Sequence, residues 1–124
     1  MKSRVLIVDD EGLLVRTLSQ AFRDAGYQVT ARGTAEEAGE VLRREKSFDL
    51  LLLDQRLPGK SGLQLLEEIA PWKGMKVVLM TAYGTEEIEQ KSRDLGVDLY
   101  LKKPFDLGSL LNEASRLLER RAGK

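Results

Sequence analysis

Three aspartates in this sequence directly follow short apolar runs. Asp9 and Asp10 come after residues 5–8, and Asp54 comes after residues 50–53. If both runs are parallel strands, their carboxyl ends meet at one edge of a sheet, and the three carboxylates lie close together. Such crowding of like charge is unfavourable unless a cation neutralises it. Because all the ligand atoms are oxygens, the sequence predicts a Mg²⁺ site, at which Mn²⁺ is the expected substitute.

Groups suited to phosphoryl transfer follow two further apolar runs. The Thr81 hydroxyl and the Ala82 N–H come after one run, and Lys103 comes after the other. A carboxylate beside a bound Mg²⁺ can attack phosphorus and form an acyl phosphate. The charge of the transferred group is then stabilised by the metal, a lysine and hydrogen-bond donors. A cis peptide bond between Lys103 and Pro104 would fix the direction of the lysine.

Each of these residues also has an ordinary structural explanation. Asp9 and Asp10 are suitable N-caps for a following helix. Asp54 and Thr81 are common turn residues. Lys103 is of a type that is usually solvated at the surface. The combination favours a functional site, because complementary groups from four strand ends at one edge are hard to obtain by chance.

The composition excludes several classes of chemistry. The 124 residues include no histidine and no cysteine, which rules out His-based triads, thiol nucleophiles and His- or Cys-ligated zinc within this chain. Twenty basic residues balance twenty acidic ones, so direct nucleic-acid binding is not expected. No apolar run approaches the ~20 residues of a membrane span, and a secretory signal is missing at the N-terminus. We expect one soluble, cytoplasmic domain without a membrane partner.

Short apolar runs alternate along the chain with segments of helical spacing. Continuous apolar runs suit strands buried on both faces of a parallel sheet. The predicted strands are 5–8, 28–31, 50–53, 77–80 and 99–102, the candidate N-caps are Thr34, Ser61, Thr85 and Asp106, and the candidate helix stops are Gly26, Pro71 and Gly96. In the first helical segment, apolar and small residues recur at the i, i+3, i+4 spacing of one helix face, at Leu13, Leu14, Thr17, Leu18, Ala21 and Phe22. The order βαβαβαβαβα predicts an α/β fold with right-handed crossovers.

The sequence resembles the receiver domain of two-component response regulators over essentially its whole length. The matching segments are 5–11, 49–59, 80–84 and 103–105. Residues 57–63 and 80–84 are most similar to receivers of the nitrogen-regulator activator class and to stand-alone phosphorelay receivers. The resemblance implies a (βα)5 flavodoxin-like three-layer sandwich, with a five-stranded parallel sheet in the order 2-1-3-4-5 and helices on both faces. We assign residues 1–120 to this domain and residues 121–124 to a tail or the start of a linker.

The resemblance implies a role for each residue at the predicted sheet edge. Asp54 would be the phosphoacceptor. The carboxylates of Asp10 and Asp54 and the backbone carbonyl of Arg56 would ligate Mg²⁺. Asp9 would join them through water or orient the site. Lys103 matches the lysine of the family, because it directly precedes a proline.

Four further positions are implied to control switching and lifetime. Thr81 matches the switch hydroxyl, and Tyr100 matches the switch aromatic, which turns from exposed toward buried as the loop after the fourth strand moves inward. Arg56 and Tyr83 occupy the two variable positions that tune the lifetime of the phosphoryl group. Both side chains are bulky and would hinder an attacking water, so the resemblance implies a long-lived phosphorylated state.

The implied function is that of a phosphoacceptor rather than a free-standing enzyme. The donor would be a phosphohistidine of a sensor histidine kinase or of a histidine phosphotransfer protein. The chain would catalyse its own phosphorylation and a slow autodephosphorylation. Phosphorylation would change the face formed by residues 85–96, 99–102 and 106–118, which would signal to an output domain or partner protein and offer a surface for a homodimer.

Two alternatives belong to other functional classes. A hydrolase of the haloacid-dehalogenase type needs a second aspartate two residues after the nucleophile. That position is Arg56 after Asp54, or Glu11 after Asp9, so the pattern fits poorly. A phosphorylation-independent interaction module of the same fold is the other alternative, together with a flavin binder. The flavin binder lacks a phosphate-binding loop rich in Ser, Thr and Gly after the first strand.

Overall fold

Five short strands form one parallel sheet in the computed structural model, which describes residues 3–122 and the side chains as far as Glu119. The strands are β1 (Arg4–Val8), β2 (Gln28–Arg32), β3 (Leu50–Asp54), β4 (Lys76–Thr81) and β5 (Leu99–Lys102). They lie in the order β2-β1-β3-β4-β5, and every neighbouring pair is parallel. This confirms the predicted α/β class and the strand order 2-1-3-4-5.

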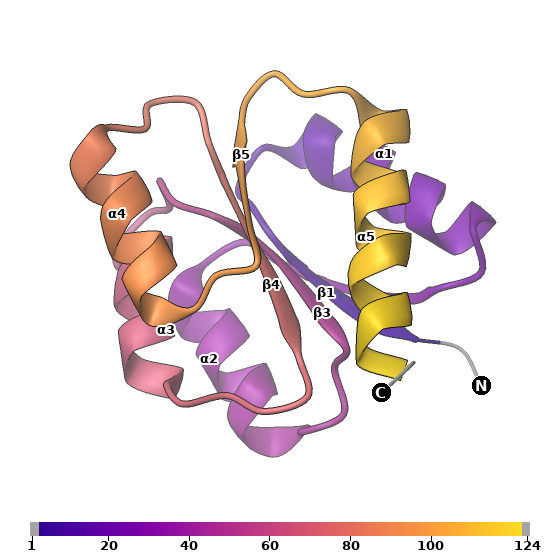
Figure 1. The fold of residues 1–124 in the computed structure, drawn as a ribbon, viewed down its shortest axis with the longest axis horizontal. Helices are drawn as coiled ribbons and strands as arrows, with labels where there is room; N and C mark the ends of the chain where they lie inside the picture. Colours follow the sequence, from indigo (N-terminus) through magenta and orange to yellow (C-terminus); the bar gives the residue numbers. More distant parts are fainter. Residues whose placement is uncertain (1–2, 123–124) are drawn as a thin grey trace.

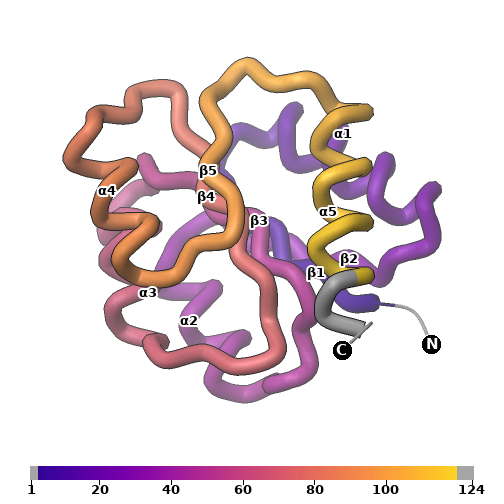
Figure 2. Tube along the Cα trace, viewed as in Figure 1, coloured from indigo at the N-terminus to yellow at the C-terminus, as the bar shows by residue number. Residues whose placement is uncertain are grey.

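Helices cover both faces of the sheet, which gives three layers (Figure 1). The helices are α1 (Gly12–Asp24), α2 (Ala35–Arg44), α3 (Gly62–Ile69), α4 (Glu86–Leu95) and α5 (Leu107–Ala122). Helices α1 and α5 lie on one face, whereas α2, α3 and α4 lie on the other (Figure 2). Among the residues that the structure describes, no helix has the length and apolar character needed to cross a membrane.

Side-chain caps fix the starts of four helices, as predicted. The Thr34 and Thr85 hydroxyls accept hydrogen bonds from backbone N–H groups three residues further on. Ser61 forms a reciprocal capping box with Gln64, and Asp106 accepts the Ser109 N–H at 2.8 Å. These caps satisfy N–H groups that have no partner inside the helix.

The central strands are buried on both faces. The four leucines of β3 have no exposed surface, and they alternate between the two faces of the sheet. Leu51 and Leu53 pack toward α2 and α3, whereas Leu50 and Leu52 pack toward α1 and α5. Burial of a strand on both faces requires a continuous apolar run, which is why this leucine segment forms a strand.

One feature near a helix end differs from the sequence analysis. Leu13 is 72% exposed, so its expected place on the buried face of α1 is wrong. It lies in the first turn of α1, where the neighbouring residues Glu11 and Gly12 are also exposed. Helix α5 extends through Ala122, and the assignment of residues 121–124 to a tail or the start of a linker stays a prediction. Residues 123 and 124 lie outside the described residues.

The parallel arrangement brings the ends of four strands to one edge. Val8 pairs with Leu53, and Thr81 pairs with Lys102, so β1, β3, β4 and β5 all end at this edge. We call it the carboxyl edge of the sheet. Residues that follow these strands therefore become neighbours, although they are far apart in the sequence.

Candidate functional site

Three aspartates gather at the carboxyl edge. Asp9 follows β1 and Asp54 ends β3, and both are almost fully buried, whereas Asp10 is exposed. One carboxylate oxygen from each residue lies within 4.8 Å of the other two. A cluster of three carboxylates, with one side open to solvent, has the ligand chemistry that a hard divalent cation requires.

The local backbone argues against a capping role for the acidic pair. The N-cap of α1 is Glu11, and no side chain caps this helix. Asp9 instead accepts the Glu11 N–H at 2.9 Å with one carboxylate oxygen. That bond holds the Asp9 carboxylate in place at the end of β1, while its second oxygen faces the centre of the site.

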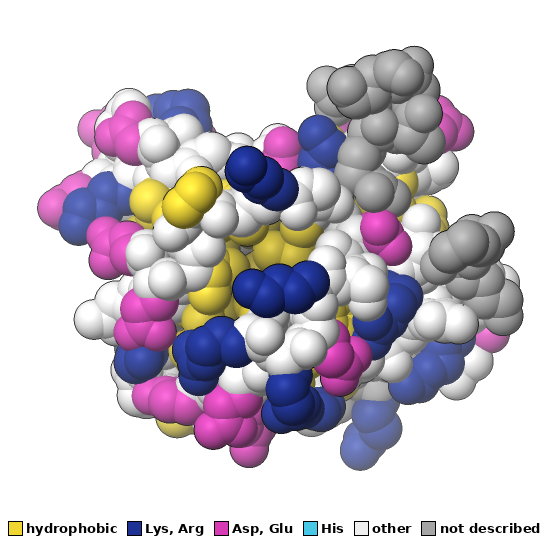
Figure 3. Space-filling model, turned by 90° about the horizontal axis from the view of Figure 1, so that it is seen from below, with side chains coloured by type: hydrophobic (Ala, Val, Ile, Leu, Met, Phe, Trp, Pro, Cys, Tyr) yellow, Lys and Arg dark blue, Asp and Glu magenta, His cyan; other side chains and the backbone are white. Residues whose placement is uncertain are grey.

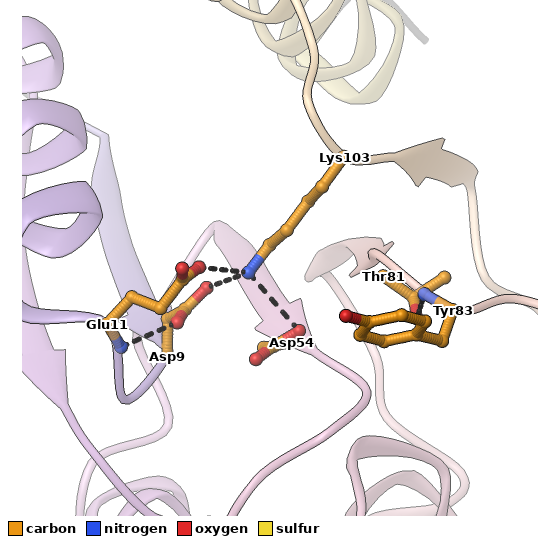
Figure 4. A network of polar contacts seen from close by, with 6 residues as sticks. All are labelled: Asp9, Glu11, Asp54, Thr81, Tyr83 and Lys103. Carbon is orange, nitrogen blue, oxygen red and sulfur yellow. Dashed lines mark hydrogen bonds and ion pairs between the residues drawn. The ribbon is translucent and has the colours of Figure 1, made fainter.

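The ammonium group of Lys103 lies between the acidic side chains, as Figure 4 shows. Its Nζ atom lies 2.8 Å from Asp9 Oδ2, 2.9 Å from Glu11 Oε1 and 3.5 Å from Asp54 Oδ1. The Lys103–Pro104 peptide bond is cis. The preceding lysine, Lys102, ends β5 and is exposed, so only the second lysine of the pair reaches the site.

Burial and neighbouring charge shift the protonation equilibria of the site. Burial raises the pKa of Asp54 to about 6, with a further rise from the charge of Asp9, although the Lys103 ammonium acts in the opposite direction. For Lys103, burial lowers the pKa, but hydrogen bonds to Asp9 and Glu11 outweigh that effect and raise it. Lys103 is therefore positively charged at neutral pH. The surroundings of Asp54 disfavour the ionised form of its carboxyl group.

Thr81 and the residues that follow it lie on the other side of Asp54 (Figure 4). Thr81 ends β4 and is 1% exposed, and its hydroxyl oxygen accepts the Tyr83 N–H at 3.1 Å. Ala82 is exposed at the start of the loop between β4 and α4. In this contact the Thr81 hydroxyl acts as an acceptor, so it retains a hydrogen that could be donated to a group bound at Asp54.

Arg56 and Tyr83 form a pair beside the aspartate. The Arg56 guanidinium carbon lies 4.9 Å from the centre of the Tyr83 ring, which is a cation–π contact. The Tyr83 side chain is largely exposed, so the pair lies at the solvent side of the site. The two residues come from different loops, after β3 and after β4.

The Tyr100 ring packs beneath the loop between β4 and α4. Among the described residues, its hydroxyl is the one buried side-chain polar atom without a hydrogen-bond partner. Burial raises the pKa of this phenol, and the charge of Glu89 raises it further. A Cβ atom at Gly84 would overlap the Tyr100 hydroxyl oxygen. The inward position of Tyr100 therefore requires glycine at position 84.

The loop after β3 is held by two hydrogen bonds to Gln55, one to its side chain and one to its backbone carbonyl. The Gln55 side chain accepts the Leu63 N–H at 2.9 Å, and the Gln55 carbonyl accepts the Gly62 N–H at 3.0 Å. A Cβ atom at Gly62 would lie 2.6 Å from the Asp54 carbonyl oxygen, so only glycine permits this close approach. The bracing fixes the end of β3, where Asp54 is located.

Three residues that shape this site have no role predicted from the sequence. Glu11 binds Lys103, Gly84 accommodates Tyr100, and Gln55 supports the loop that carries Arg56. The acidic run at residues 9–11 was a signal for Glu11. No local pattern identifies the other two, because both act through contacts between separate elements.

Comparisons with known proteins assign almost the whole chain to one family. A family model for the response regulator receiver domain matches residues 5–115. The transcriptional activator protein PfeR of Pseudomonas aeruginosa is 40% identical over 117 residues, which are 94% of this chain and 38% of that protein. The sporulation initiation phosphotransferase F of Bacillus subtilis is 31% identical over 119 residues, which are 95% of each chain.

Solved structures of receiver domains are also similar to this chain. A CheY-like response regulator receiver domain protein from Methanospirillum hungatei has a TM-score of 0.94 and 31% identity, and the match covers 99% of this chain and 98% of that one. The non-phosphorylated HemR receiver domain from Leptospira biflexa has a TM-score of 0.86 and 32% identity, with 94% of each chain covered. At these identities the likeness extends to sequence as well as fold.

Proposed function

Because this chain belongs to the response regulator receiver domain family, we propose that Asp54 accepts a phosphoryl group from a phosphohistidine of a sensor histidine kinase or a histidine phosphotransfer protein. Phosphorylation chemistry is the role of the family, whose members are not classical enzymes. A phosphotransferase is among the relatives of this chain, which supports a place in phosphoryl transfer between proteins. The match to residues 5–115 supports residues 1–120 as the receiver domain.

The observation that carries the proposal is the environment of Asp54. Its carboxylate is buried at the end of β3, with one oxygen 3.5 Å from the Lys103 ammonium. In the transfer, a bond forms between an Asp54 oxygen and phosphorus as the bond between phosphorus and the donor imidazole nitrogen breaks. The imidazole is the leaving group, and Lys103 stabilises negative charge on the phosphoryl oxygens.

The acidic cluster supports Mg²⁺ as the metal of the site. Asp10 and Asp54 would supply carboxylate ligands, together with the backbone carbonyl of Arg56, and Asp9 would orient the site or bind through water. The mutual repulsion of these carboxylates supports binding of a cation, because the raised pKa of Asp54 has the Asp9 charge among its causes. When bound, Mg²⁺ would neutralise charge on the phosphoryl oxygens.

The switch would begin with Thr81. Phosphorylation adds up to about two negative charges at Asp54. The Thr81 hydroxyl and the Ala82 N–H would donate hydrogen bonds to the new oxygens, which would draw the loop between β4 and α4 inward. Tyr100 lies directly beneath this loop, so its position is linked to the position of the loop.

The face formed by α4, β5 and α5 would carry the signal. Tyr100 is part of β5, and its ring packs against Gly84 in the loop that leads into α4. A change at Thr81 would therefore alter this face before any other surface. An output domain, a partner protein or a second copy of the chain would bind there.

The experiment is phosphorylation followed by intact-mass measurement. Wild type is incubated with Mg²⁺ and acetyl phosphate or phosphoramidate, and we expect a gain of one phosphoryl group. Asp54→Asn should not gain mass, and wild type should not gain mass in a magnesium-free buffer. Asp94→Asn is the matched control, because Asp94 is exposed on α4 and should not affect the reaction.

Two results would contradict the proposal. Phosphorylation of Asp54→Asn to the same extent as wild type would place the acceptor elsewhere. The absence of phosphorylation in wild type with small donors, and with a phosphorylated histidine phosphotransfer protein, would favour an interaction module that works without phosphorylation.

A further inference from the structure

A concave site lies at the end of the sheet opposite the carboxyl edge. It is a pocket of about 540 Å³, formed by the carboxyl ends of α2 and α3 and by the segments that lead into β3 and β4. Pockets of this size hold small organic ligands in many proteins. We call it the basal pocket, and we define it by Leu42, Arg43, Lys46, Phe48, Trp72 and Lys73.

The floor of the basal pocket is apolar. Phe48 is 4% exposed and belongs to the core, and Leu42, Ile69, Trp72 and Met75 are half-buried at its edge. Figure 3 views the molecule from this end and shows hydrophobic side chains in a hollow, with Lys and Arg side chains beside and across it. An aromatic or branched group placed there would lose water contact against these side chains.

The charges around the pocket are unbalanced. The acidic side chains that line it are held by bases outside it, with Glu45 at 2.6 Å from Arg4 and Glu68 at 2.6 Å from Lys60. Arg43, Lys46 and Lys73 are exposed, and within the described part of the chain none of them forms an ion pair. The rim therefore offers positive charge that none of the described residues neutralises in an ion pair.

From this combination we infer that the basal pocket binds a small amphipathic organic anion, with an aromatic or branched apolar body and one carboxylate, sulfonate or similar acidic group. The apolar body packs on Phe48 and Trp72, and the acidic group binds Lys46 and Lys73 at the rim. Charge-assisted hydrogen bonds of this kind are stronger than neutral ones. The inference does not depend on phosphorylation of Asp54, because the two sites lie at opposite ends of the sheet.

The chain provides its own reporter for this test. Trp72 is the single tryptophan of the sequence, and it lines the pocket. The probe is 1-anilinonaphthalene-8-sulfonate, an aromatic anion whose fluorescence rises in apolar surroundings. We expect saturable binding with energy transfer from Trp72 to the dye. N-phenyl-1-naphthylamine, which has the same rings without the charge, should bind at least about tenfold more weakly if a charged hydrogen bond is lost.

Charge variants separate the pocket from other surfaces. Lys46→Glu and Lys73→Glu should each weaken dye binding about tenfold. Lys73→Arg keeps the positive charge and should retain the affinity for the dye. This result would show that a substitution at position 73 does not abolish binding by misfolding. Lys91→Glu is the matched control, because Lys91 is exposed on α4 and the change in net charge is identical. Trp72→Phe should remove energy transfer but leave the directly excited dye signal.

Several outcomes would overturn the inference. They are equal binding of the charged and neutral dyes, equal weakening by Lys91→Glu, or dye binding without energy transfer from Trp72. Binding of an acidic peptide with no binding of the free dye would assign the surface to a protein partner instead. Phosphorylation measured by intact mass should be unchanged in Lys73→Glu, so failure at one site is distinguishable from failure at the other.

Discussion

Asp54 carries its charge between a second carboxylate, Asp9, and the ammonium group of Lys103. Its pKa is about 6 in the folded protein, against an ordinary value of 3.8. Between these two pH values the folded state binds more protons than the unfolded state. The contribution of Asp54 to the free energy of unfolding is therefore largest below pH 3.8 and falls as the pH rises through 6.

A neutral amide at position 54 should remove the free-energy cost of a charged Asp54 in the folded state. In a buffer that contains a chelator, Asp54→Asn should raise the free energy of unfolding at pH 7.5 by on the order of 2 kcal/mol relative to wild type. At pH 4 the two proteins should be nearly equal, because the wild-type carboxyl is then mostly protonated. Urea denaturation at both pH values measures the difference, with Asp24→Asn as the control. A difference that is the same at both pH values would contradict the argument.

The pair formed by Arg56 and Tyr83 makes a second prediction at the scale of single residues. The two side chains meet at 4.9 Å over the solvent side of the site, where they would hinder a water molecule that attacks the acyl phosphate. Removing a cation–π contact of about 0.5–1 kcal/mol should shorten the half-life of the phosphorylated state about two- to fivefold. Arg56→Ala and Tyr83→Ala should each have this effect.

The lifetime is followed by intact mass after the phosphodonor is removed. Arg44→Ala is the matched control for loss of a positive charge, because Arg44 is exposed at the end of α2. A wild-type half-life on the scale of seconds would contradict the long lifetime that we expect. An unchanged half-life in both variants would show that the pair does not restrict water.

At the scale of elements, the loop between β4 and α4 and strand β5 meet at one contact. Tyr100 fits beneath the loop because Gly84 has no side chain. The buried hydroxyl has no hydrogen-bond partner, so this position has a free-energy cost that packing must offset. That cost lowers the free energy needed to move the ring to an outward position, as the proposed switch would require.

Gly84→Ala should exclude the inward position of Tyr100. In protein labelled with 3-fluorotyrosine, the Tyr100 fluorine resonance should move toward the value of free tyrosine and show a solvent isotope shift. Tyr100→Phe assigns the resonance. Gly33→Ala is the matched control, because a Cβ atom there meets no other atom within 4 Å. An unchanged Tyr100 resonance in Gly84→Ala would mean that the ring does not depend on this glycine.

The same loop illustrates how far the sequence could predict the structure. The strands and caps were predictable because each depends on a local signal, such as the leucine run in β3 or Ser61 before α3. The contact between Gly84 and Tyr100 depends on the rotamer of one ring and on the path of a loop, and neither has a local signal. Leu13 was misplaced because, at about 3.6 residues per turn, it lies on the opposite side of α1 from Phe22, whereas its neighbour Leu14 lies on the buried side.

At the carboxyl edge, the sequence predicted which residues lie close together better than it predicted their individual side-chain contacts. Asp9, Asp54 and Lys103 meet because parallel strands bring their carboxyl ends together, and this follows from topology. That Lys103 also binds Glu11 follows from the length and direction of two side chains. The basal pocket lies beyond the sequence analysis for the same reason, since its walls come from four separate segments.

At the scale of the whole molecule, acidic and basic side chains are concentrated at opposite ends of the sheet, although the net charge is zero. The formal net charge is zero, yet acidic side chains cluster at the carboxyl edge, and basic side chains without an ion pair among the described residues surround the basal pocket. Each end attracts ions of opposite sign over a range of about 10 Å at ordinary salt concentrations. Cations and anions should therefore stabilise the folded chain at different ends.

Mg²⁺ should stabilise the whole fold through the acidic end alone. A ligand that binds only the folded state raises the free energy of unfolding by about 2.7 kcal/mol at a free concentration 100 times its Kd. Wild type should show this rise in urea denaturation with increasing Mg²⁺, whereas Asp10→Asn and Asp54→Asn should lose most of it because each removes a proposed ligand. Sodium chloride at matched ionic strength separates binding from screening, and Asp24→Asn should respond as wild type does. Equal stabilisation of wild type and Asp10→Asn would place the cation outside the cluster, and with it the chemistry proposed for Asp54.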